Sequence, residues 1–458
     1  MTNKQFGANL VHIRQKRGLT QVNLAKKSGL HRSFISGVEK GERNITLETI
    51  AKLGHALEIS SAELFASDIH GLGNRNTPTD VTFLKIGGTW DMIATKEGLR
   101  GTGSIDDDAL AKIEASSKSE DRVRERLEME FAQTKSIQKD LASHFFWVTD
   151  IDKLIGGEFY PIFSADGSNF RPSIFSAVIA HLLKTVADSP LRQVIAGVGT
   201  DTTDMLMPFL DVFLFDQTAL PILVSGANRS HRETHSDAPQ NFHDLAFATH
   251  LPLMPGAYYI FNKTIYRGGD LIKVDPKEEP STLEGMITFF APQRTQTRIG
   301  YLQAQTRNPG SSRKLVTYSS KKIFDAMNSI VTIDLGDNNP IEHEVAKILD
   351  PRFPSVIVKS HALGNAPNPI RNAVKAAILK GKSVMNVSRC LMGETDDRYY
   401  VSLSNLNKRE LAKSSKKVLE GGKLNHMTAK AILTRALLEK RSQKETQELI
   451  DAYSKRTF

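Results

Sequence analysis

The sequence predicts a multidomain protein in which a small all-α domain is followed by two α/β domains. Apolar residues recur at helical spacing over residues 1–68, whereas short apolar runs alternate with helical patterns from about residue 80 to residue 440. Such an alternation is typical of parallel sheets that are covered by helices. The length of 458 residues agrees with this division, because a single ordinary core does not grow to that size.

We expect the domain boundaries to follow shifts in composition. A run rich in glycine, asparagine and proline follows the first domain, and a polar stretch without periodicity separates the two α/β domains. The charged pattern at about 105–145 predicts a helical insertion in the larger α/β domain, either a lid or an amphipathic helix pair that covers the sheet. The predicted division is an all-α domain over 1–68, a linker over 69–79, a larger α/β domain over 80–290, a linker over 291–325, a smaller α/β domain over 326–440 and a basic tail over 441–458.

Composition limits where the protein can act. The net charge of +9 favours a polyanionic partner, although the excess is mild for this length. The single cysteine, Cys390, excludes an internal disulfide and suits a reducing cytosol. The most apolar stretch, residues 205–224, is interrupted by Asp211, Asp216 and two prolines, so we expect no membrane span. Because the N-terminus also lacks a signal-peptide pattern, these features predict a cytoplasmic protein.

Glycine and threonine mark the ends of the helices in the all-α domain. Gly18 ends a first helix and Thr20 caps a second, and a tight turn then leads into a third helix over 31–40. A fourth helix begins after Thr46, where Thr49 stands in the position that a complete capping box gives to Glu or Gln. A short fifth helix is predicted to follow.

The stretch from Gly18 to Asn44 resembles the helix-turn-helix of the Cro and phage-repressor (XRE-like) family. In that family the third helix enters the major groove, and the glutamine that opens the second helix contacts phosphate. The resemblance implies that double-stranded DNA is a partner and that Arg32 reads a guanine. The implied DNA contacts are Gln21, His31, Arg32, Ser33, Ser36, Lys40 and Arg43. A helical dimerisation or protein-binding module is the alternative, but ten Lys or Arg residues against six Asp or Glu in this domain favour DNA.

One predicted strand organises the larger α/β domain. The stretch Val194–Thr202 is a short apolar run that stops at two glycines and then presents Thr200, Asp201 and Thr202. In open α/β sheets, ligands bind at the carboxyl ends of the strands. A carboxylate at this edge can hold an ammonium group or orient a hydroxyl, and a hydroxyl beside it can attack or position water.

Two further predicted strands end in polar side chains. Gly87 and Gly88 follow an apolar strand and place Thr89 over the sheet edge, and a strand from about residue 161 ends at Asp166. A phosphate-binding loop is the competing interpretation of the two glycines. The sequence excludes it, because the Gly-Lys-Ser/Thr ending is missing.

From Phe83 to about Lys440, the chain resembles the bacterial type I L-asparaginases. The resemblance implies two α/β domains of the asparaginase/glutaminase type. It also implies a homo-oligomer, a dimer or tetramer, whose sites form at subunit contacts. The stretches that carry the resemblance, in the order and spacing of the family, are 87–89, 199–202, 225–227, 236–241, 261–268, Lys273 and 363–367.

The resemblance implies the catalytic roles. Thr89 would attack the side-chain amide of L-asparagine, or of a related small amide, to form an acyl-enzyme that water then hydrolyses. Thr200, Asp201 and Lys273 would form a hydrogen-bonded set beside it. The chemistry suits these residues, because a lysine held between a hydroxyl and a carboxylate can relay protons.

Other candidates surround the substrate. The resemblance implies that Asp166 holds the α-ammonium group and that Asn365 of the partner subunit helps to close the site. His231 and His235 are four residues apart, which leaves a metal site as an alternative to hydrogen-bonded or solvated histidines. We expect neither a metal nor a cofactor.

Four positions depart from the family pattern. Leu99 stands where the family has a loop tyrosine that helps to deprotonate the nucleophile, and Ala165 stands where a serine binds the substrate carboxylate. Ile86 replaces the threonine before the two glycines, and Trp90 follows the nucleophile. The loss of a general base can by itself cost about 10²–10⁴ in rate.

The whole chain thus predicts a DNA-binding, asparaginase-like amidohydrolase in which DNA binding serves regulation. A non-catalytic regulator of transcription that senses an amino acid is the first alternative, and a triggered effector that depletes a metabolite is the second. The intact catalytic set favours hydrolysis, whereas Leu99 and Ala165 favour sensing. Cys390 falls in a region that forms a regulatory amino-acid site in some type I relatives, the alternative being a small buried core cysteine.

Overall fold

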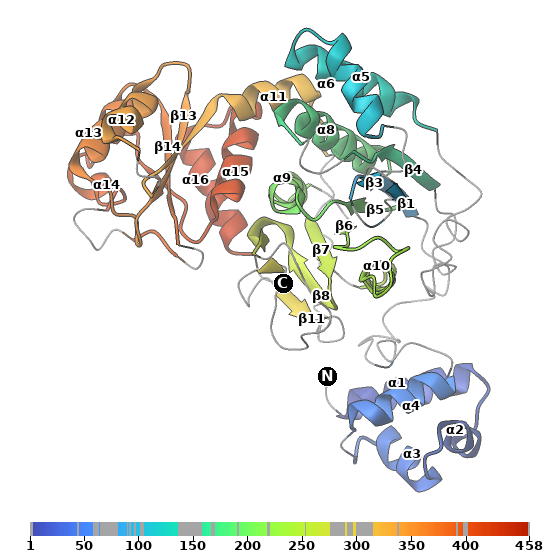
Figure 1. Cartoon of the computed structure of the whole chain (residues 1–458). Helices are drawn as coiled ribbons and strands as arrows, with labels where there is room; N and C mark the ends of the chain where they lie inside the picture. The colour runs from blue at the N-terminus through green and yellow to red at the C-terminus, as the bar shows by residue number, and fades with distance from the viewer. Residues whose placement is uncertain are drawn as a thin grey trace. The chain divides into compact units, whose positions relative to one another are not determined.

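The chain divides into two compact units in the computed structural model (Figure 1). The first unit comprises Met1–Pro78 with Thr297–Asn308, and the second comprises Thr79–Gln296 with Pro309–Phe458. The structure describes residues 3–43, 45–57, 64, 81–88, 90, 93–95, 98–100, 105–135, 158–165, 170–189, 192–217, 220–251, 253–274, 289–290, 296–298, 315–336, 339–390, 393–396 and 402–456. No helix among these residues is long and apolar enough to cross a membrane.

The first unit is a helical bundle, and its helices begin and end near the capping residues and glycines that the sequence indicates. Its helices are α1 (Asn3–Lys16), α2 (Gln21–Ser28), α3 (Arg32–Glu39) and α4 (Leu47–Leu57). Thr20 caps α2 by accepting the N–H of Asn23 at 3.1 Å, and Gly29 ends it with φ of +67°. Apolar side chains from all four helices meet in one core, among them Phe6, Leu24, Ile35 and Leu53.

The fourth helix has the incomplete cap that its sequence predicts. The hydroxyl of Thr46 accepts the backbone N–H of Thr49 at 3.2 Å, and the two hydroxyl groups lie 3.0 Å apart. The predicted fifth helix lies outside the described residues apart from Leu64, which is buried in the same core.

A mostly parallel sheet forms the centre of the larger α/β domain. Its strands lie in the order β8-β7-β6-β5-β1-β4, and only the β7–β8 pair in this series is antiparallel. These strands are β1 (Val81–Ile86), β4 (Glu158–Phe163), β5 (Gln193–Val198), β6 (Ile222–Ser225), β7 (Ala257–Phe261) and β8 (Thr264–Arg267). Strands β1, β5, β6 and β7 are buried along their whole length, as expected for parallel strands covered on both faces.

Helices cover this sheet (Figure 1). They are α5 (Asp107–Ser116), α6 (Glu120–Gln133), α8 (Pro172–Asp188), α9 (Thr203–Leu214) and α10 (Ala238–Ala248). Helices α5 and α6 form the described part of the predicted insertion, and α6 packs on α8. Leu127 and Phe131 of α6 belong to the main core, which is the burial expected of an amphipathic helix that covers a sheet.

Short elements complete the larger domain. A hairpin pairs β2 (Ile93–Thr95) with β3 (Gly98–Arg100), and β9 (Ile272–Lys273) pairs with β10 (Phe289–Phe290). A 3₁₀ turn, η5 (Gly268–Asp270), connects β8 to β9. Strand β11 (Gln296–Arg298) lies where the two units divide along the chain.

The smaller α/β domain is built on a parallel sheet in the order β12-β13-β14-β15. Its strands are β12 (Ile330–Asp334), β13 (Ser355–Ser360), β14 (Ser383–Ser388) and β15 (Leu419–Glu420). Its helices are α11 (Ser320–Asn328), α12 (Ile341–Leu349), α13 (Asn368–Leu379), α14 (Leu406–Arg409), α15 (His426–Leu438) and α16 (Gln443–Ser454). The predicted fold class, an all-α domain followed by two α/β domains, is confirmed. Helix α11 begins inside the stretch predicted as a linker.

Most of the stretch 441–458, predicted as a basic tail, is the packed helix α16. Helix α16 starts with a complete capping box between Ser442 and Glu445, and it buries Tyr453 completely. Figure 1 shows α15 and α16 between the sheet of the smaller domain and α9 of the larger one. One continuous hydrophobic cluster includes Phe213 of α9, Leu433 of α15 and Tyr453 of α16, so the two α/β domains share a core.

Candidate active site and nucleic-acid interface

The carboxyl end of β5 presents the polar residues that the sequence indicates. Backbone and side-chain groups of Thr202 both donate to the carbonyl of Gly199, at 3.2 and 3.0 Å, and the hydroxyl of Thr203 donates to the same carbonyl at 2.8 Å. These bonds turn the chain sharply from the strand into α9. The turn leaves Thr200 buried and Asp201 exposed at the start of the helix.

Lys273 reaches this turn from β9. Its Nζ donates to Thr200 Oγ1 at 2.9 Å and to Asp201 Oδ1 at 2.6 Å. The lysine side chain is 13% exposed and that of Asp201 is 66% exposed, so the ammonium group is sheltered while the carboxylate is open to solvent. The structure therefore brings three of the four predicted catalytic residues into one hydrogen-bonded group.

A second carboxylate lies beside the lysine, and the sequence analysis missed it. Burial raises the pKa of Asp204, and the hydrogen bond that its carboxylate accepts from the backbone N–H of Lys273 acts in the opposite direction. Asp204 lies in the first turn of α9, three residues after Asp201. That spacing places both acids on one side of the N-terminal end of the helix. It was the sequence signal that could have identified Asp204 as a site residue.

The loop after β1 packs tightly against the same turn. Gly87 and Gly88 adopt φ values of +72° and +107°, which favour glycine. A Cβ on Gly88 would lie 2.6 Å from the carbonyl oxygen of Val198 and 2.8 Å from the nitrogen of Gly199. The residue before Thr89 thus touches the residue before Thr200. Thr89 itself and Asp166 lie outside the described residues.

Trp90, one of the four departures, is an anchor of this loop. It is fully buried, and its indole Nε1–H donates to the carbonyl of Gly87 at 2.9 Å. Its own carbonyl accepts the backbone N–H of His231 at 3.0 Å and faces Nδ1 of the same histidine at 3.0 Å. Because a carbonyl can only accept, Nδ1 carries the proton.

The histidine geometry argues against the metal alternative. Nε2 of His231 accepts from Arg232 Nε at 3.3 Å, so both ring nitrogens are already engaged. His235 is exposed. Within the described ranges, no three His, Cys, Asp or Glu side chains gather as a metal ion would require.

The remaining candidates occupy separate places. Ala165 is completely buried, and Ile86 is also buried at the end of β1. Leu99 lies in β3, but its side chain is outside the described set. Asn365 is in the smaller domain, where its backbone pairs with His361 and its buried Oδ1 has no hydrogen-bond partner among the described residues. Cys390 is exposed, so the default expectation of a small buried core cysteine was wrong.

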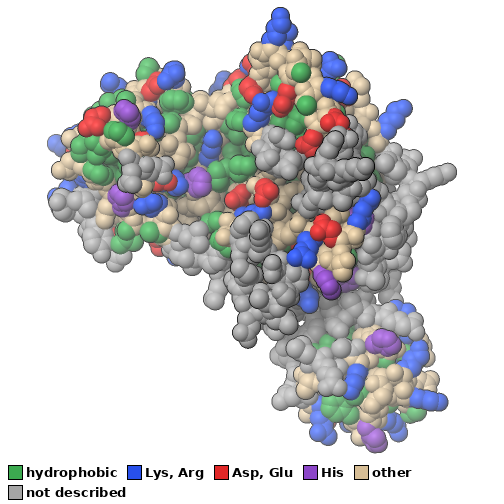
Figure 2. All heavy atoms as spheres, viewed as in Figure 1, with side chains coloured by type: hydrophobic (Ala, Val, Ile, Leu, Met, Phe, Trp, Pro, Cys, Tyr) green, Lys and Arg blue, Asp and Glu red, His purple; other side chains and the backbone are tan. Residues whose placement is uncertain are grey.

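In the first unit, the predicted DNA contacts lie on and around α3. Arg32, Ser33, Lys40 and Arg43 are exposed, whereas Ser36 is partly buried. His31 caps α3, since its Nδ1 accepts the backbone N–H of Ser33 at 3.4 Å and lies 2.7 Å from the Ser33 hydroxyl. On the face of this unit seen in Figure 2, Lys, Arg and His side chains are visible at many points.

A buried ion pair that the sequence analysis missed ties the helices of this unit together. Arg14 and Glu39 form two hydrogen bonds, at 2.6 and 3.1 Å, with side chains 11% and 5% exposed. Gln21, the predicted phosphate contact, donates to the same carboxylate at 2.7 Å. Glu39 thus links α1, α2 and α3. The sequence signal for this ion pair was Arg14, which stands four residues after Leu10 and therefore on the buried face of α1.

The comparisons with known proteins follow the domain division. Residues 12–64 match the helix-turn-helix family, residues 80–282 match the asparaginase N-terminal domain, and residues 341–450 match the glutaminase/asparaginase C-terminal domain. An uncharacterized HTH-type transcriptional regulator, y4dJ of Sinorhizobium fredii, is 35% identical over 79 residues, which are 17% of this chain and 88% of that protein.

The α/β part has more distant relatives. An L-asparaginase of Dirofilaria immitis is 23% identical over 206 residues, which are 44% of this chain but only 33% of that protein. The thermostable L-asparaginase from Thermococcus kodakarensis superposes with a TM-score of 0.54 at 17% identity, over 81% of this chain and 96% of that one. At this identity the likeness shows the fold alone. The chain therefore belongs, through its amino-terminal domain, to the helix-turn-helix family, and this domain is fused to the N-terminal and C-terminal domains of the asparaginases.

Proposed function

We propose that this protein binds DNA through α3 and hydrolyses L-asparagine, or a related small amide, to the acid and ammonia. The observation that carries the enzymatic part is the placement of Lys273 Nζ at 2.9 Å from Thr200 Oγ1 and 2.6 Å from Asp201 Oδ1. A lysine fixed between a hydroxyl and a carboxylate at the carboxyl end of a parallel strand is a proton-handling group at a ligand-binding edge.

In the proposed reaction, Thr89 is the nucleophile. Its hydroxyl oxygen bonds to the carbon of the side-chain amide, and its proton passes through the Thr200–Lys273 pair to the amide nitrogen, which leaves as ammonia. Water then attacks the acyl-enzyme, returns a proton to Thr89 and releases the acid. The contact of Gly88 with Gly199 supports this assignment, because it joins the two loops that carry the reacting groups.

The same proposal gives the substrate its binding groups. Asp166 would pair with the α-ammonium group, and Asn365 of the partner subunit would approach from the smaller domain. The buried Oδ1 of Asn365 has no hydrogen-bond partner within the part of the chain that the structure describes, and this supports a homo-oligomer, because a buried acceptor is costly to leave without a donor. No step of the reaction needs a cofactor or metal.

A sensing role is the second candidate, and Ala165 is the observation that favours it. Its methyl group is completely buried at the end of β4, where the asparaginase resemblance places a serine hydroxyl for the substrate carboxylate. A site that binds an amino acid without rapid turnover would act by shifting the helix-turn-helix units between arrangements of different DNA affinity.

Ammonia release distinguishes the two candidates. Purified protein is assayed with asparagine, glutamine and their small amides, beside Thr89→Ala and Thr185→Ala. The control removes a hydroxyl of α8 that donates to the carbonyl of His181, one turn earlier in the same helix, at 3.0 Å. Turnover that is lost in Thr89→Ala alone supports hydrolysis. No turnover in the wild type, together with an asparagine-dependent change in DNA affinity, would establish sensing instead.

A further inference from the structure

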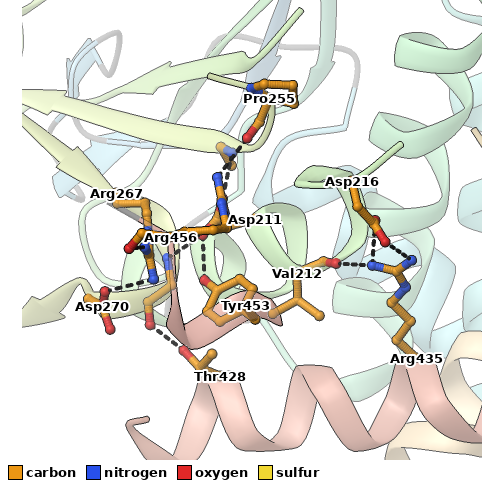
Figure 3. A network of polar contacts seen from close by, with 12 residues as sticks. Asp211, Val212, Asp216, Pro255, Arg267, Asp270, Thr428, Arg435, Tyr453 and Arg456 are labelled. Atoms are coloured by element: carbon orange, nitrogen blue, oxygen red, sulfur yellow. Dashed lines mark hydrogen bonds and ion pairs between the residues drawn. The ribbon is translucent and has the colours of Figure 1, made fainter. Parts of the chain in front are cut away.

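A buried cluster of charges joins α9 to the end of the smaller domain (Figure 3). Asp211 of α9 is completely buried, and its Oδ1 accepts from Ala257 N–H and Arg456 Nη1, both at 3.0 Å. Its Oδ2 accepts the Tyr453 hydroxyl and the Gly269 N–H and lies 3.6 Å from Arg267 Nε. Burial alone would raise the pKa of Asp211, but Arg456 and Arg267 hold that pKa below its ordinary value. The carboxylate is therefore charged, and both of its oxygens accept hydrogen bonds.

We call Asp211, Arg267, Tyr453 and Arg456 the Asp211 clamp. Arg267 closes it on one side, by pairing with Asp270 at 3.1 Å and donating to the carbonyl of Arg456 at 2.8 Å. Gly269 fits only because it has no side chain, since a Cβ there would lie 1.6 Å from the Tyr453 hydroxyl. The clamp thus joins the end of β8 and η5 to α9 and to the end of α16.

The segment that leads from the clamp to Lys273 lies along one side of α9. A Cβ on Gly268 would lie 2.8 Å from the carbonyl of Met207, and Gly269 bonds Asp211. Farther along, the backbone N–H of Lys273 bonds Asp204, and its Nζ bonds the turn before α9. Positions 204, 207 and 211 are spaced three and four residues apart, so they share one face of the helix.

We propose that the Asp211 clamp positions Lys273. The clamp holds Gly269 of η5 against α9. Lys273 follows four residues after Gly269, and its side chain bonds Thr200 and Asp201 at the N-terminal end of the same helix. Tyr453 and Arg456 are then positioning residues that act through Asp211 and Gly269, although they lie at the C-terminal end of the smaller domain. This inference rests on the proposed function for its catalytic consequence, but the placement of Lys273 can be tested without turnover.

The chain offers a matched control for the clamp. Arg435 of α15 donates to Asp216, just beyond the C-terminal end of α9, at 2.8 and 3.1 Å, and to the carbonyl of Val212 at 2.7 Å. Arg435 is also a buried arginine of the smaller domain that pairs with an aspartate near α9 (Figure 3). Among the described residues, the hydrogen bonds of Arg435 run to Glu439, Val212 and Asp216 and not to η5. Asp216→Asn therefore weakens the contact between the domains without loosening the segment that carries Lys273.

The experiment measures how fast Lys273 reacts with acetic anhydride, by peptide mass spectrometry, relative to the exposed Lys184 in the same sample. Wild type, Tyr453→Phe, Arg456→Gln and Asp216→Asn are compared as full chains, below the unfolding midpoint of each. We expect both clamp variants to raise the relative labelling of Lys273 severalfold, because its bonds to Thr200 and Asp201 open more often. Asp216→Asn should leave the labelling at the wild-type value.

Turnover is the second readout. The clamp variants should lower kcat about tenfold with little change in KM, since a displaced proton-handling group affects the reacting state more than substrate binding. Labelling of Lys273 that stays at the wild-type value in both clamp variants, or that rises equally in Asp216→Asn, would overturn the inference. If the wild type releases no ammonia, the proposed function fails, while increased labelling in the clamp variants alone would still establish the positioning.

Discussion

The indole ring of Trp90 occupies the space that a side chain on Gly197 would need. A Cβ on this glycine would lie 2.6 Å from the ring, and the same indole donates its N–H to the carbonyl of Gly87. Strand β5 and the loop that precedes Thr89 are thereby packed face to face. The tryptophan that departs from the asparaginase resemblance depends on the glycine in the neighbouring strand.

Gly197→Ala should therefore disturb the loop that carries Thr89. The new methyl group would push the indole away and cost about 1–3 kcal/mol of folding free energy, as overpacked cores do. Ammonia release should fall together with the unfolding midpoint. Adding Trp90→Phe, which leaves a smaller ring, should restore part of both quantities, and a double variant no better than Gly197→Ala would contradict this relationship.

Lys273→Met should abolish most of the proposed hydrolysis. The change keeps an unbranched side chain one atom shorter but removes the donor to Thr200 and Asp201, so kcat should fall by about 10²–10⁴. Lys321→Met, which removes an exposed lysine on α11, serves as the control. Initial rates of ammonia release measure the effect, and a kcat within twofold of the wild type would remove Lys273 from the mechanism.

Stability should fall as the pH drops from 6.5 to 4, in part because of His181. Burial lowers the pKa of this histidine to about 4, with Lys184 contributing in the same direction. Its folded pKa lies below the unfolded value of 6.5, so the unfolded chain binds more protons in this window. The stabilising effect of the neutral ring is fully present above pH 6.5 and is lost as the pH falls through 4.

The lowered pKa of His181 corresponds to a change of at most about 3 kcal/mol in the free energy of unfolding over this pH range. His181→Gln should flatten the dependence of unfolding free energy on pH between 4 and 6.5, measured by urea titration at each pH. The exposed His343→Gln is the comparison. An unchanged slope in His181→Gln would show that the histidine does not contribute.

Arg32 and Lys40 should affect DNA binding in different ways. Both are exposed near the two ends of α3. After an operator has been selected from random duplexes, Arg32→Ala should cost about 1–3 kcal/mol and relax the preference at one base pair. Lys40→Ala should weaken binding to all duplexes alike. It should also reduce the salt dependence of the binding constant by the amount expected for the loss of about one phosphate contact. Equal losses at every base position for Arg32→Ala would assign this arginine to phosphate instead.

Local signals predicted much of the fold. The cap at Thr20, the left-handed Gly29 and the two glycines after β1 each depend on backbone geometry within a few residues, and the structure has them where the sequence indicates. The convergence of Thr200, Asp201 and Lys273 was available only through the family resemblance, because their separation along the chain carries no local signal.

The contacts that sequence patterns cannot give are those between distant segments. Asp211 and Asp216 were read only as interruptions of an apolar stretch, yet they are the partners of Arg456 and Arg435 across the domain boundary. The basic residues after position 440 looked like a solvated tail for the same reason. A charged residue inside an apolar run signals a buried partner, but nothing local identifies that partner.

The clamp has a consequence for the order in which the protein matures. Arg267 and Arg456, which meet in the core of the larger domain, are separated by 189 residues. A ribosome that has just completed the larger domain has therefore not yet supplied the Arg456 guanidinium or the Tyr453 ring that contact the buried Asp211. We expect that domain to reach its native packing only after the C-terminal end of the smaller domain has been translated.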